Sequence, residues 1–335
     1  MKNYDILAIG DIVTDAFIRL SDAEATCDID NENCRLSVRF GDKVPYDFVE
    51  VVKAVGNSAN AAVSGARLGL STALIATIGN DQNGKDCLIE LEKNKVSTEF
   101  IKTNTEFPTN YHYVLWYEVE RTILVKHAPF PYSLPDIRLP KWVYLSSMGE
   151  NSVEYHEEIA NYLEVHPEIK LAFQPGTFQI KLGKEKLKSI YKRSDIFFCN
   201  VEEAERILGK RDNVVVSKEE KIINLMQEVN QLGPKIVVIT DGINGAYAYD
   251  GTEAFFMPIY PHDPYERTGA GDAFASTVVA MLAKDKTLKE ALAYAPINSM
   301  SVVRDIGAQK GLLAMEEMEK YMASAPIDYK VKKIK

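Results

Sequence analysis

The sequence contains few cysteines, no long apolar segment and no excess of basic residues. Only four of its 335 residues are cysteines, none stands in a Cys-x-x-Cys pair, and no histidine lies at zinc-ligand spacing, which argues against a structural zinc site. We therefore expect free thiols in a reducing cytoplasm. No apolar run reaches the roughly 18 residues of a membrane-spanning helix, and the N-terminus carries no signal-peptide pattern.

The charge balance is acidic. The chain has 39 Lys and Arg against 48 Asp and Glu, a net charge of −9, whereas a nucleic-acid-binding protein normally presents a basic face. A phosphate-bearing substrate remains compatible, because a local field can oppose the net charge. With 46% hydrophobic and 26% charged residues, the composition is that of a globular protein. We expect small-molecule partners rather than nucleic acids or membranes.

Short apolar runs alternate with amphipathic helical segments along most of the chain. Runs that indicate buried strands occupy residues 5–9, 72–78, 142–146, 171–174, 196–199 and 236–240. Helical periodicity covers residues 57–68, 88–95, 153–165, 201–208 and 218–232. This alternation predicts an α/β fold in which helices cover both faces of a mainly parallel sheet. The length suffices for one large domain with a small second one.

Two segments interrupt the alternation. Residues 35–55 hold β-rich runs with no helix between them, and residues 111–126 indicate a hairpin around Val119 to Arg121. We interpret both as insertions that build a small β-lid, which suits a reaction that must exclude water. The alternatives are an extension of the main sheet or a dimer interface. The Lys-rich tail after Tyr329 is predicted to be solvated.

The segment from Gly269 to Asp272 combines two glycines with an acid at the start of an apolar helical run. Glycines let the backbone approach a ligand closely, and a helix start presents unpaired N–H groups to an anion. The Gly269, Ala270 and Gly271 amides would hold the charge on a transferred phosphate, while Asp272 takes the proton of an acceptor hydroxyl. The alternative is a glycine-rich turn capped by the acid.

Glu266 to Asp272 resembles the C-terminal signature of the ribokinase (PfkB) family of carbohydrate and nucleoside kinases. Gly56 to Asn60, followed by Arg67-Leu68-Gly69, resembles that family's N-terminal glycine–asparagine pattern, and the similarity extends over nearly the whole chain. The resemblance implies a ribokinase-like three-layer α/β/α sandwich with a mainly parallel central sheet and a small β-lid. The corresponding division is a nucleotide- and substrate-binding domain at 1–10, 56–104 and 130–335, and a discontinuous lid at 11–55 and 105–129.

The resemblance also implies a set of acceptor-binding residues. The glycine and the asparagine of the family pattern face the sugar, and an acid after the first strand grips its hydroxyls. A turn or a helix cap is the alternative for each of them, above all for Asn57. The residues concerned are Asp11, Asp15, Gly56, Asn57 and Asn60.

A second set is implied for the nucleotide. Asn200 and Glu203 match the family residues near the phosphates and Mg²⁺, with Glu203 reaching the metal through water, although a capping box is compatible. A glycine turn lies over the nucleotide, for which a tight β-turn is the alternative. The remaining matches are Thr240, Gly242, Gly245, Thr268, and, on the adenine side, Asn298 and Gly307.

Three features depart from the expected motifs. Glu266 and Arg267 replace the family's usual Asp and Thr, which leaves dependence on a monovalent cation open, and Arg267 would instead supply a positive charge near the phosphates. Residues 79–85 have P-loop spacing, but Asp86 stands where Ser or Thr is needed, which favours a strand-to-helix turn. No Gly-x-Gly-x-x-Gly follows the first strand, which argues against a dinucleotide-binding oxidoreductase.

These observations together predict an ATP- and Mg²⁺-dependent kinase that phosphorylates a hydroxymethyl group of a small ribose-like or fructose-like sugar. The alternative acceptor is a nucleoside such as adenosine, whose base would stack on Tyr111, Tyr113 or Trp116 of the lid. A non-catalytic sugar-binding protein would also retain the fold, although Asp272 and its glycines argue against it. A homodimer through the lid is compatible with each.

Overall fold

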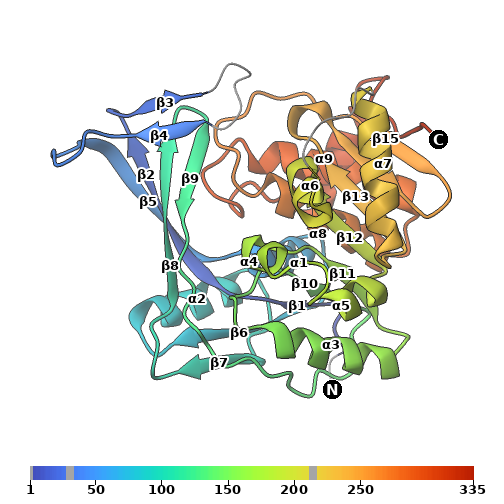
Figure 1. Cartoon of the computed structure of the whole chain (residues 1–335), viewed down its shortest axis with the longest axis horizontal. Helices are drawn as coiled ribbons and strands as arrows, with labels where there is room; N and C mark the ends of the chain where they lie inside the picture. The colour runs from blue at the N-terminus through green and yellow to red at the C-terminus, as the bar shows by residue number, and fades with distance from the viewer. Residues whose placement is uncertain (1–2, 28–33, 211–216) are drawn as a thin grey trace.

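The computed structural model describes residues 3–27, 34–210 and 217–335. Their strands form a ten-stranded central sheet, a separate four-stranded sheet at one side of it, and a short two-stranded hairpin (Figure 1). The central sheet consists of β1 (Ile6–Ile9), β6 (Thr72–Gly79), β7 (Ile101–Asn104), β10 (Trp142–Leu145), β11 (Lys170–Phe173), β12 (Ile196–Asn200), β13 (Ile236–Thr240), β14 (Ala246–Tyr249), β15 (Ala254–Met257) and β16 (Lys332–Lys333).

The strand order of the central sheet is β16-β15-β14-β13-β12-β11-β10-β1-β6-β7. All pairs from β7 to β13 are parallel, and β14, β15 and β16 are added in antiparallel fashion. The chain first builds outward from β1 to β6 and β7 and then returns to β10 on the other side of β1. The carboxyl ends of β1 and β10 therefore mark a switch point, where open α/β sheets bind their ligands.

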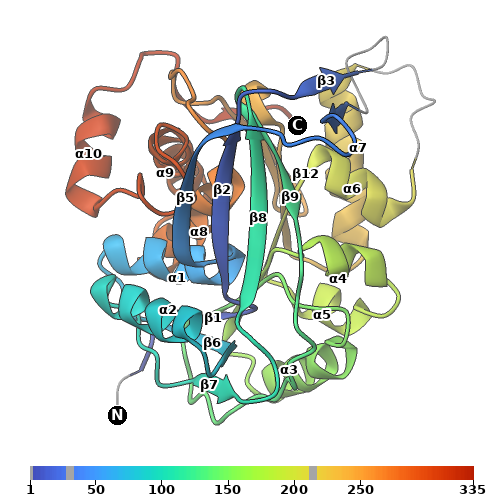
Figure 2. The same cartoon turned by 90° about the vertical axis from the view of Figure 1, so that its left-hand side faces the viewer.

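Helices cover both faces of this sheet (Figure 2). One face packs against α1 (Asn57–Arg67), α2 (Gln82–Lys93), α8 (Ala270–Ala283), α9 (Leu288–Val302) and α10 (Met315–Ala323). The other packs against α3 (Val153–Val165), α4 (Thr177–Leu182), α5 (Lys188–Arg193), α6 (Val201–Leu208) and α7 (Lys218–Gln231). Successive residues of one strand alternate between the two cores: Ile6 and Ala8 face the first, Leu7 and Ile9 the second. The predicted α/β fold with helices on both faces is confirmed.

A four-stranded sheet, here called the lid sheet, lies across the carboxyl ends of the central strands at one side (Figures 1 and 2). It consists of β2 (Val13–Leu20), β5 (Tyr46–Val55), β8 (Asn110–Tyr117) and β9 (Glu120–Leu124), in the order β5-β2-β8-β9. Its inner face packs Phe17, Val114 and Trp116 against Ile306 of the main body. The predicted 111–126 hairpin is confirmed as β8 and β9, whereas the division into domains stays a prediction.

Two expectations from the sequence are wrong. The tail after Tyr329 is not simply solvated, because β16 pairs with β15 and Ile334 N–H donates to the Ala254 carbonyl at 2.8 Å. Cys27 and Cys34 are joined by a disulfide rather than free. The reason is local. Cys27 directly follows β3 (Glu24–Thr26) and Cys34 directly precedes β4 (Arg35–Ser37), and the pairing of these two strands brings the cysteines opposite each other. Cys87 and Cys199 are free and buried, as expected.

Within the described residues, no helix is both long and apolar enough to cross a bilayer.

Candidate active site

A cavity of about 590 Å³ lies between the carboxyl ends of the central strands and the inner face of the lid sheet. Its volume is in the range of small-molecule sites. Sixteen of the eighteen residues predicted for the site line it: Asp11, Asp15, Gly56, Asn57, Asn60, Asn200, Glu203, Thr240, Gly242, Gly245, Arg267, Thr268, Gly269, Ala270, Gly271 and Asp272.

The first turn of α8 forms one wall of this cavity. Gly269 is the N-cap with φ +83°, and a Cβ there would lie 2.5 Å from the Cα of Ala308, so only glycine fits both the backbone and the packing. Gly271 is helical and exposed, and a Cβ would meet no atom within 4 Å beyond its chain neighbours and its own helix backbone. Its lack of a side chain leaves the helix N-terminus open to a ligand rather than to protein.

The Asp272 carboxylate follows these glycines and is held by two amides. Asn60 Nδ2 donates to its Oδ2 at 2.7 Å, and Gln174 Nε2 donates to its Oδ1 at 3.1 Å. Gln174 directly follows β11 and Asn60 lies in the first turns of α1. Burial raises the pKa of Asp272 above the ordinary carboxyl value, although both hydrogen bonds oppose this shift. The result is a carboxylate of increased basicity that faces the cavity.

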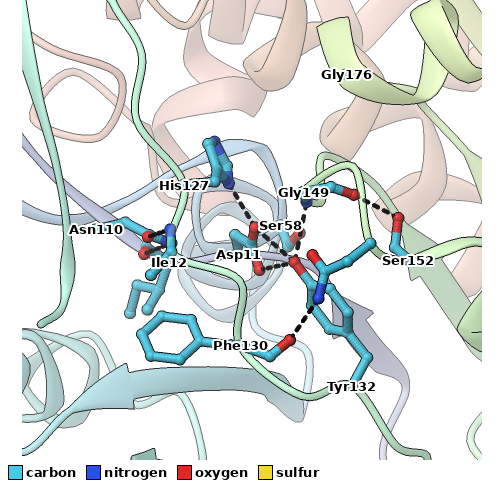
Figure 3. A network of polar contacts seen from close by, with 12 residues as sticks. Asp11, Ile12, Ser58, Asn110, His127, Phe130, Tyr132, Gly149, Ser152 and Gly176 are labelled. Carbon is cyan, nitrogen blue, oxygen red and sulfur yellow. Dashed lines mark hydrogen bonds and ion pairs between the residues drawn. The ribbon is translucent and has the colours of Figure 1, made fainter. Parts of the chain in front are cut away.

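Asp11 is the centre of a second polar network (Figure 3). Its carboxylate contacts His127 Nδ1 and accepts from Tyr132 Oη at 3.0 Å, while Tyr132 Oη itself accepts from the Gly149 N–H at 2.9 Å. Asp11 is 2% exposed. Its two oxygens are thus committed to protein groups, so Asp11 fixes the chain that returns from β9 to the main body and holds the His127 ring at the cavity wall.

Asp15 and His112 form a second carboxylate–histidine pair, in which each side chain keeps an atom without a hydrogen bond among the described residues. Asp15 on β2 is the direct register partner of His112 on β8, and His112 Nδ1 is 3.4 Å from Asp15 Oδ1. Both line the cavity at 8% exposure, yet within the described residues neither Asp15 Oδ1 nor His112 Nε2 makes a hydrogen bond. Buried polar atoms without partners are rare, and here they point to a polar ligand.

On the opposite side, Asn200 and Glu203 begin α6. The Asn200 side chain accepts from the Glu203 N–H at 2.8 Å, and Glu203 Oε2 accepts from the Asn200 N–H at 2.9 Å. The capping box considered from the sequence is therefore present. Burial, and secondarily the charge of Asp272, raise the pKa of Glu203.

The loop between β13 and β14 completes this side of the cavity. The Asp241 N–H donates to the Gly245 carbonyl at 2.8 Å, so the segment is the tight turn that the sequence indicated. Thr240, Gly242 and Gly245 of this turn line the cavity.

The loop before α8 carries two ion pairs to the lid sheet. Arg267 pairs with Glu120, and Arg121 Nε lies 3.9 Å from Oε1 of Glu266, which is fully buried. Glu266 also accepts from the Thr268 N–H at 2.7 Å. Consecutive lid residues of opposite charge thus face consecutive residues of opposite charge beside the glycines.

Asn298 and Gly307 do not line the cavity. Asn298 is fully buried and joins three segments, since its Nδ2 donates to Thr277 Oγ1 at 2.8 Å and its Oδ1 accepts from the Leu313 N–H at 3.0 Å. Gly307 packs against the Val52 side chain of the lid sheet. Both residues face protein in this structure, so their contact with adenine stays a prediction without support from the cavity lining.

The three lid aromatics considered for stacking on a base lie away from the cavity. None of Tyr111, Tyr113 and Trp116 lines the cavity. Tyr113 is 50% exposed and contacts Tyr111 on the outer face of β8, while Trp116 is buried against Tyr265 and Phe48. The alternation of strand residues separates Tyr111 and Tyr113 from His112, which faces inward together with the buried Trp116.

The cavity residues that the sequence analysis missed include four with charged or polar side chains: Arg121, His112, His127 and Gln174. Two of them carried a signal. Gln174 follows a predicted parallel strand, and the carboxyl ends of such strands line ligand crevices. His112 shares the inward phase of β8 with the buried Val114 and Trp116. Nothing local pointed to His127, because its position depends on Asp11, which is distant in the sequence.

The residues 50–315 match the model of the pfkB family of carbohydrate kinases. An ATP-dependent 6-phosphofructokinase of Thermoanaerobacterium thermosaccharolyticum is 24% identical over 330 residues, which cover 92% of this chain and 90% of the relative. A ribokinase of Bacillus subtilis is 24% identical over 80% of this chain and 87% of its own. The Arabidopsis thaliana ribokinase complexed with ribose and ATP superposes with a TM-score of 0.77 at 18% identity, covering 96% of this chain and 99% of that one.

The family model spans most of the chain, and the glycines and acid that suggested it stand at the cavity. The fold is ribokinase-like, and the chain belongs to the pfkB family of carbohydrate kinases.

Proposed function

We propose that this enzyme transfers the γ-phosphoryl group of ATP to a hydroxymethyl group of a small sugar, ribose-like or fructose-like. The observation that carries the proposal is the Asp272 carboxylate, which faces the cavity one residue after the open glycine of a helix start and is held by two amide donors. The 6-phosphofructokinase and ribokinase relatives, and the similar structure that contains ribose and ATP, support this class of reaction.

In this reaction Asp272 accepts the proton of the acceptor hydroxyl as its oxygen attacks the phosphorus atom. The raised pKa of its carboxyl suits that step, since a more basic carboxylate takes a proton more readily. The Gly269, Ala270 and Gly271 amides and the α8 dipole face the charge that develops on the transferred group. The residues therefore supply positioning and electrostatic stabilisation, which account for most of the catalysis in phosphoryl transfer.

The donor set also fits Mg²⁺. Glu203 and Asp272 are cavity-lining carboxylates, and the negative charge of Asp272 helps to raise the pKa of Glu203, a mutual repulsion that a divalent cation relieves. Glu203 would hold the ion through water, because one of its oxygens caps α6. When bound, Mg²⁺ neutralises charge on the nucleotide phosphates. Among the described residues no cluster of three metal-ligating side chains preforms an all-protein site, which agrees with a metal held mainly by phosphate and water.

The acceptor would bind beside Asp15 and His112, whose unpartnered atoms match the hydroxyls of an uncharged polyol. A nucleoside acceptor loses its main support, because the lid aromatics lie outside the cavity. The Asp15 carboxylate beside His112 would also repel an anionic acceptor group at this point. A small neutral sugar is therefore our preferred acceptor.

The test is ATP consumption with Mg²⁺ across D-ribose, D-fructose and adenosine. We expect turnover with a sugar, and we expect Asp272→Asn to lower kcat by about 10²–10⁴-fold, the contribution of a general base. Asp328→Asn, an exposed position away from the cavity, is the matched control and should keep full activity.

Full activity of Asp272→Asn would show that the carboxylate is not the base. Saturable binding of a sugar without turnover of any acceptor would favour the non-catalytic alternative.

We further propose that two copies associate through the outer face of the lid sheet. One row across its four strands consists of Val51, Ala16, Tyr113 and Leu124, and the first, third and fourth of these are 45%, 50% and 52% exposed. Ala16 is only 2% exposed, so the other three side chains form the surface of this row. Exposed apolar side chains gathered on a sheet surface are typical of an interaction site. A second copy is the occupant that we propose, since the same row on its partner would be self-complementary.

A further inference from the structure

The orientation of two side-chain amides determines what Asp272 can do. Asn60 and Gln174 each place an N–H group on the carboxylate, at 2.7 and 3.1 Å. An amide turned by 180° would instead present its carbonyl oxygen to the carboxylate, because the two ends of an amide have nearly the same shape and opposite polarity. The charged carboxylate itself favours the N–H ends, and a second fixed contact on each amide would keep that orientation when Asp272 takes up a proton.

On the Asn60 side, a backbone carbonyl sets the polarity. The Ala54 carbonyl can only accept, and Gln309 Nε2 lies 2.7 Å from it, so the nitrogen of Gln309 must face this point. The same nitrogen lies 2.9 Å from Asn60 Oδ1 and donates its second hydrogen there. Asn60 must then turn its own nitrogen toward Asp272. Gln309 and Asn60 are 5% and 4% exposed, so water does not compete for these groups.

The position of Gln309 is fixed by other contacts. The Arg67 side chain donates to the backbone carbonyl of Gln309 at 2.7 Å and to the backbone carbonyl of Leu312 at 2.9 Å. Ala54, which Gln309 contacts, has φ +58° and is the penultimate residue of β5, two residues before Gly56, the N-cap of α1. One amide thus contacts both the junction of the lid sheet and the residue that holds the carboxylate.

On the Gln174 side, a buried hydroxyl has the same role. Tyr144 Oη donates to Gln174 Oε1, which leaves Gln174 Nε2 for Asp272. Tyr144 is fully buried on β10, and burial raises the pKa of its hydroxyl, so it stays protonated and remains a donor. On each side, therefore, a buried donor fixes an amide, and that amide donates to one of the two oxygens of the Asp272 carboxylate.

We propose, on the premise that Asp272 is the base of the proposed reaction, that Gln309 and Tyr144 are positioning residues that fix the polarity of the two amides on Asp272. Neither contacts a reacting atom. They act through Asn60 and Gln174, and they keep both carboxylate oxygens facing N–H donors while the carboxylate awaits the acceptor proton.

The decisive variant is Gln309→Glu, which keeps the shape of the side chain and reverses its polarity toward Asn60. We expect kcat to fall about tenfold or more, as for a lost hydrogen bond to a charged group. The acid limb of the kcat/KM profile should move to higher pH, because the Asn60 hydrogen bond lowers the pKa of Asp272. The KM for ATP should stay within about twofold. The assay uses ATP with Mg²⁺ and D-ribose, D-fructose or adenosine as acceptor.

Tyr144→Phe removes one oxygen atom and keeps the packing if Gln309→Glu fails to fold. We expect a smaller loss of kcat with the same direction of shift in the acid limb. Tyr191→Phe is the matched control, since Tyr191 is equally buried but packs on the opposite face of the central sheet. It should leave both kcat and the pH profile unchanged.

A double-mutant cycle separates positioning from general stability. If Gln309 acts through Asn60, Gln309→Met should lower kcat in the wild type and have no further effect in an Asn60→Ala background. Additive losses would overturn the proposal, as would wild-type kcat and pH profile in both Gln309→Glu and Tyr144→Phe. These results are distinct from a failure of the proposed function, which Asp272→Asn tests by itself.

Discussion

At the scale of single residues, the role of His112 in the cavity can be tested by substitution. Its Nδ1 faces Asp15, and its Nε2 is buried without a partner among the described residues. A carboxylate on one ring nitrogen fixes the ring and leaves the other nitrogen for a ligand. His112 is therefore placed to contact an acceptor hydroxyl through Nε2.

Gln and Asn at position 112 distinguish the two ring nitrogens, because the amide nitrogen of Gln reaches the place of Nε2 and that of Asn the place of Nδ1. We expect His112→Gln to keep the KM for the acceptor within about threefold and His112→Asn to raise it about tenfold, the effect of one lost hydrogen bond. The KM for ATP serves as internal control. Equal effects of the two variants, or a change confined to ATP, would contradict the assignment.

Single residues also show where the sequence was sufficient. Gly269 to Asp272 could be assigned because a helix start, two glycines and an acid are adjacent in the chain, and adjacency survives folding. Asn298 could not, because its burial depends on Thr277 and Leu313, which only the packed structure brings to it. Gln309 went unnoticed for the same reason, since its partners Ala54 and Asn60 are about 250 residues away.

At the scale of elements, the β8–β9 hairpin and the loop before α8 are joined by two ion pairs of opposite sense. Glu120 pairs with Arg267 at the surface, where both side chains are about half exposed and such a pair contributes about 0–1 kcal/mol. Arg121 faces the fully buried Glu266 and lines the cavity. Loss of a partner from a buried carboxylate is the more costly change, so the two pairs should differ in effect.

We expect Arg121→Ala to lower kcat/KM by at least about tenfold and Glu120→Ala by less than about fivefold. Because the positive charge of Arg121 lowers the pKa of Asp272, its removal should also move the acid limb of the kcat/KM profile to higher pH. Steady-state kinetics over a pH series measures both effects, with Arg121→Lys as the charge-preserving control. A larger loss in Glu120→Ala would show that the surface pair dominates the contact.

The helices and strands could be predicted from the sequence where their residues form a clear local hydrophobic pattern. The six apolar runs predicted as strands are β1, β6, β10, β11, β12 and β13, all of them buried parallel strands. β16 was missed because its lysines carry no apolar signal, and only pairing with β15 makes a strand of them. Likewise, β2 carries the cavity-lining residues Val13 and Asp15 but gave no separate signal within the predicted lid segment.

At the scale of the whole molecule, the proposed dimer depends on the outer face of the lid sheet. If the row through Val51, Tyr113 and Leu124 is an interface, charges placed in it must be desolvated on association, which is costly. We expect sedimentation to show a dimer for the wild type, and we expect Val51→Lys with Leu124→Lys to weaken association by at least about 100-fold. Val165→Lys, at an apolar position on α3 that is 71% exposed, is the matched control. A monomeric wild type at micromolar concentration would refute the dimer.

The order of the central strands has a consequence for evolution. Groups that would meet the alcohol come from β2, β8 and the strand ends beside the switch point, whereas those assigned to the nucleotide come from β12, β13 and α8. Substitutions can therefore affect the two groups of residues separately. After gene duplication, substitutions in the lid sheet would change the acceptor specificity while the residues assigned to the nucleotide are conserved. With this arrangement, descendants of the enzyme could change their acceptor without changing the residues proposed for phosphoryl transfer.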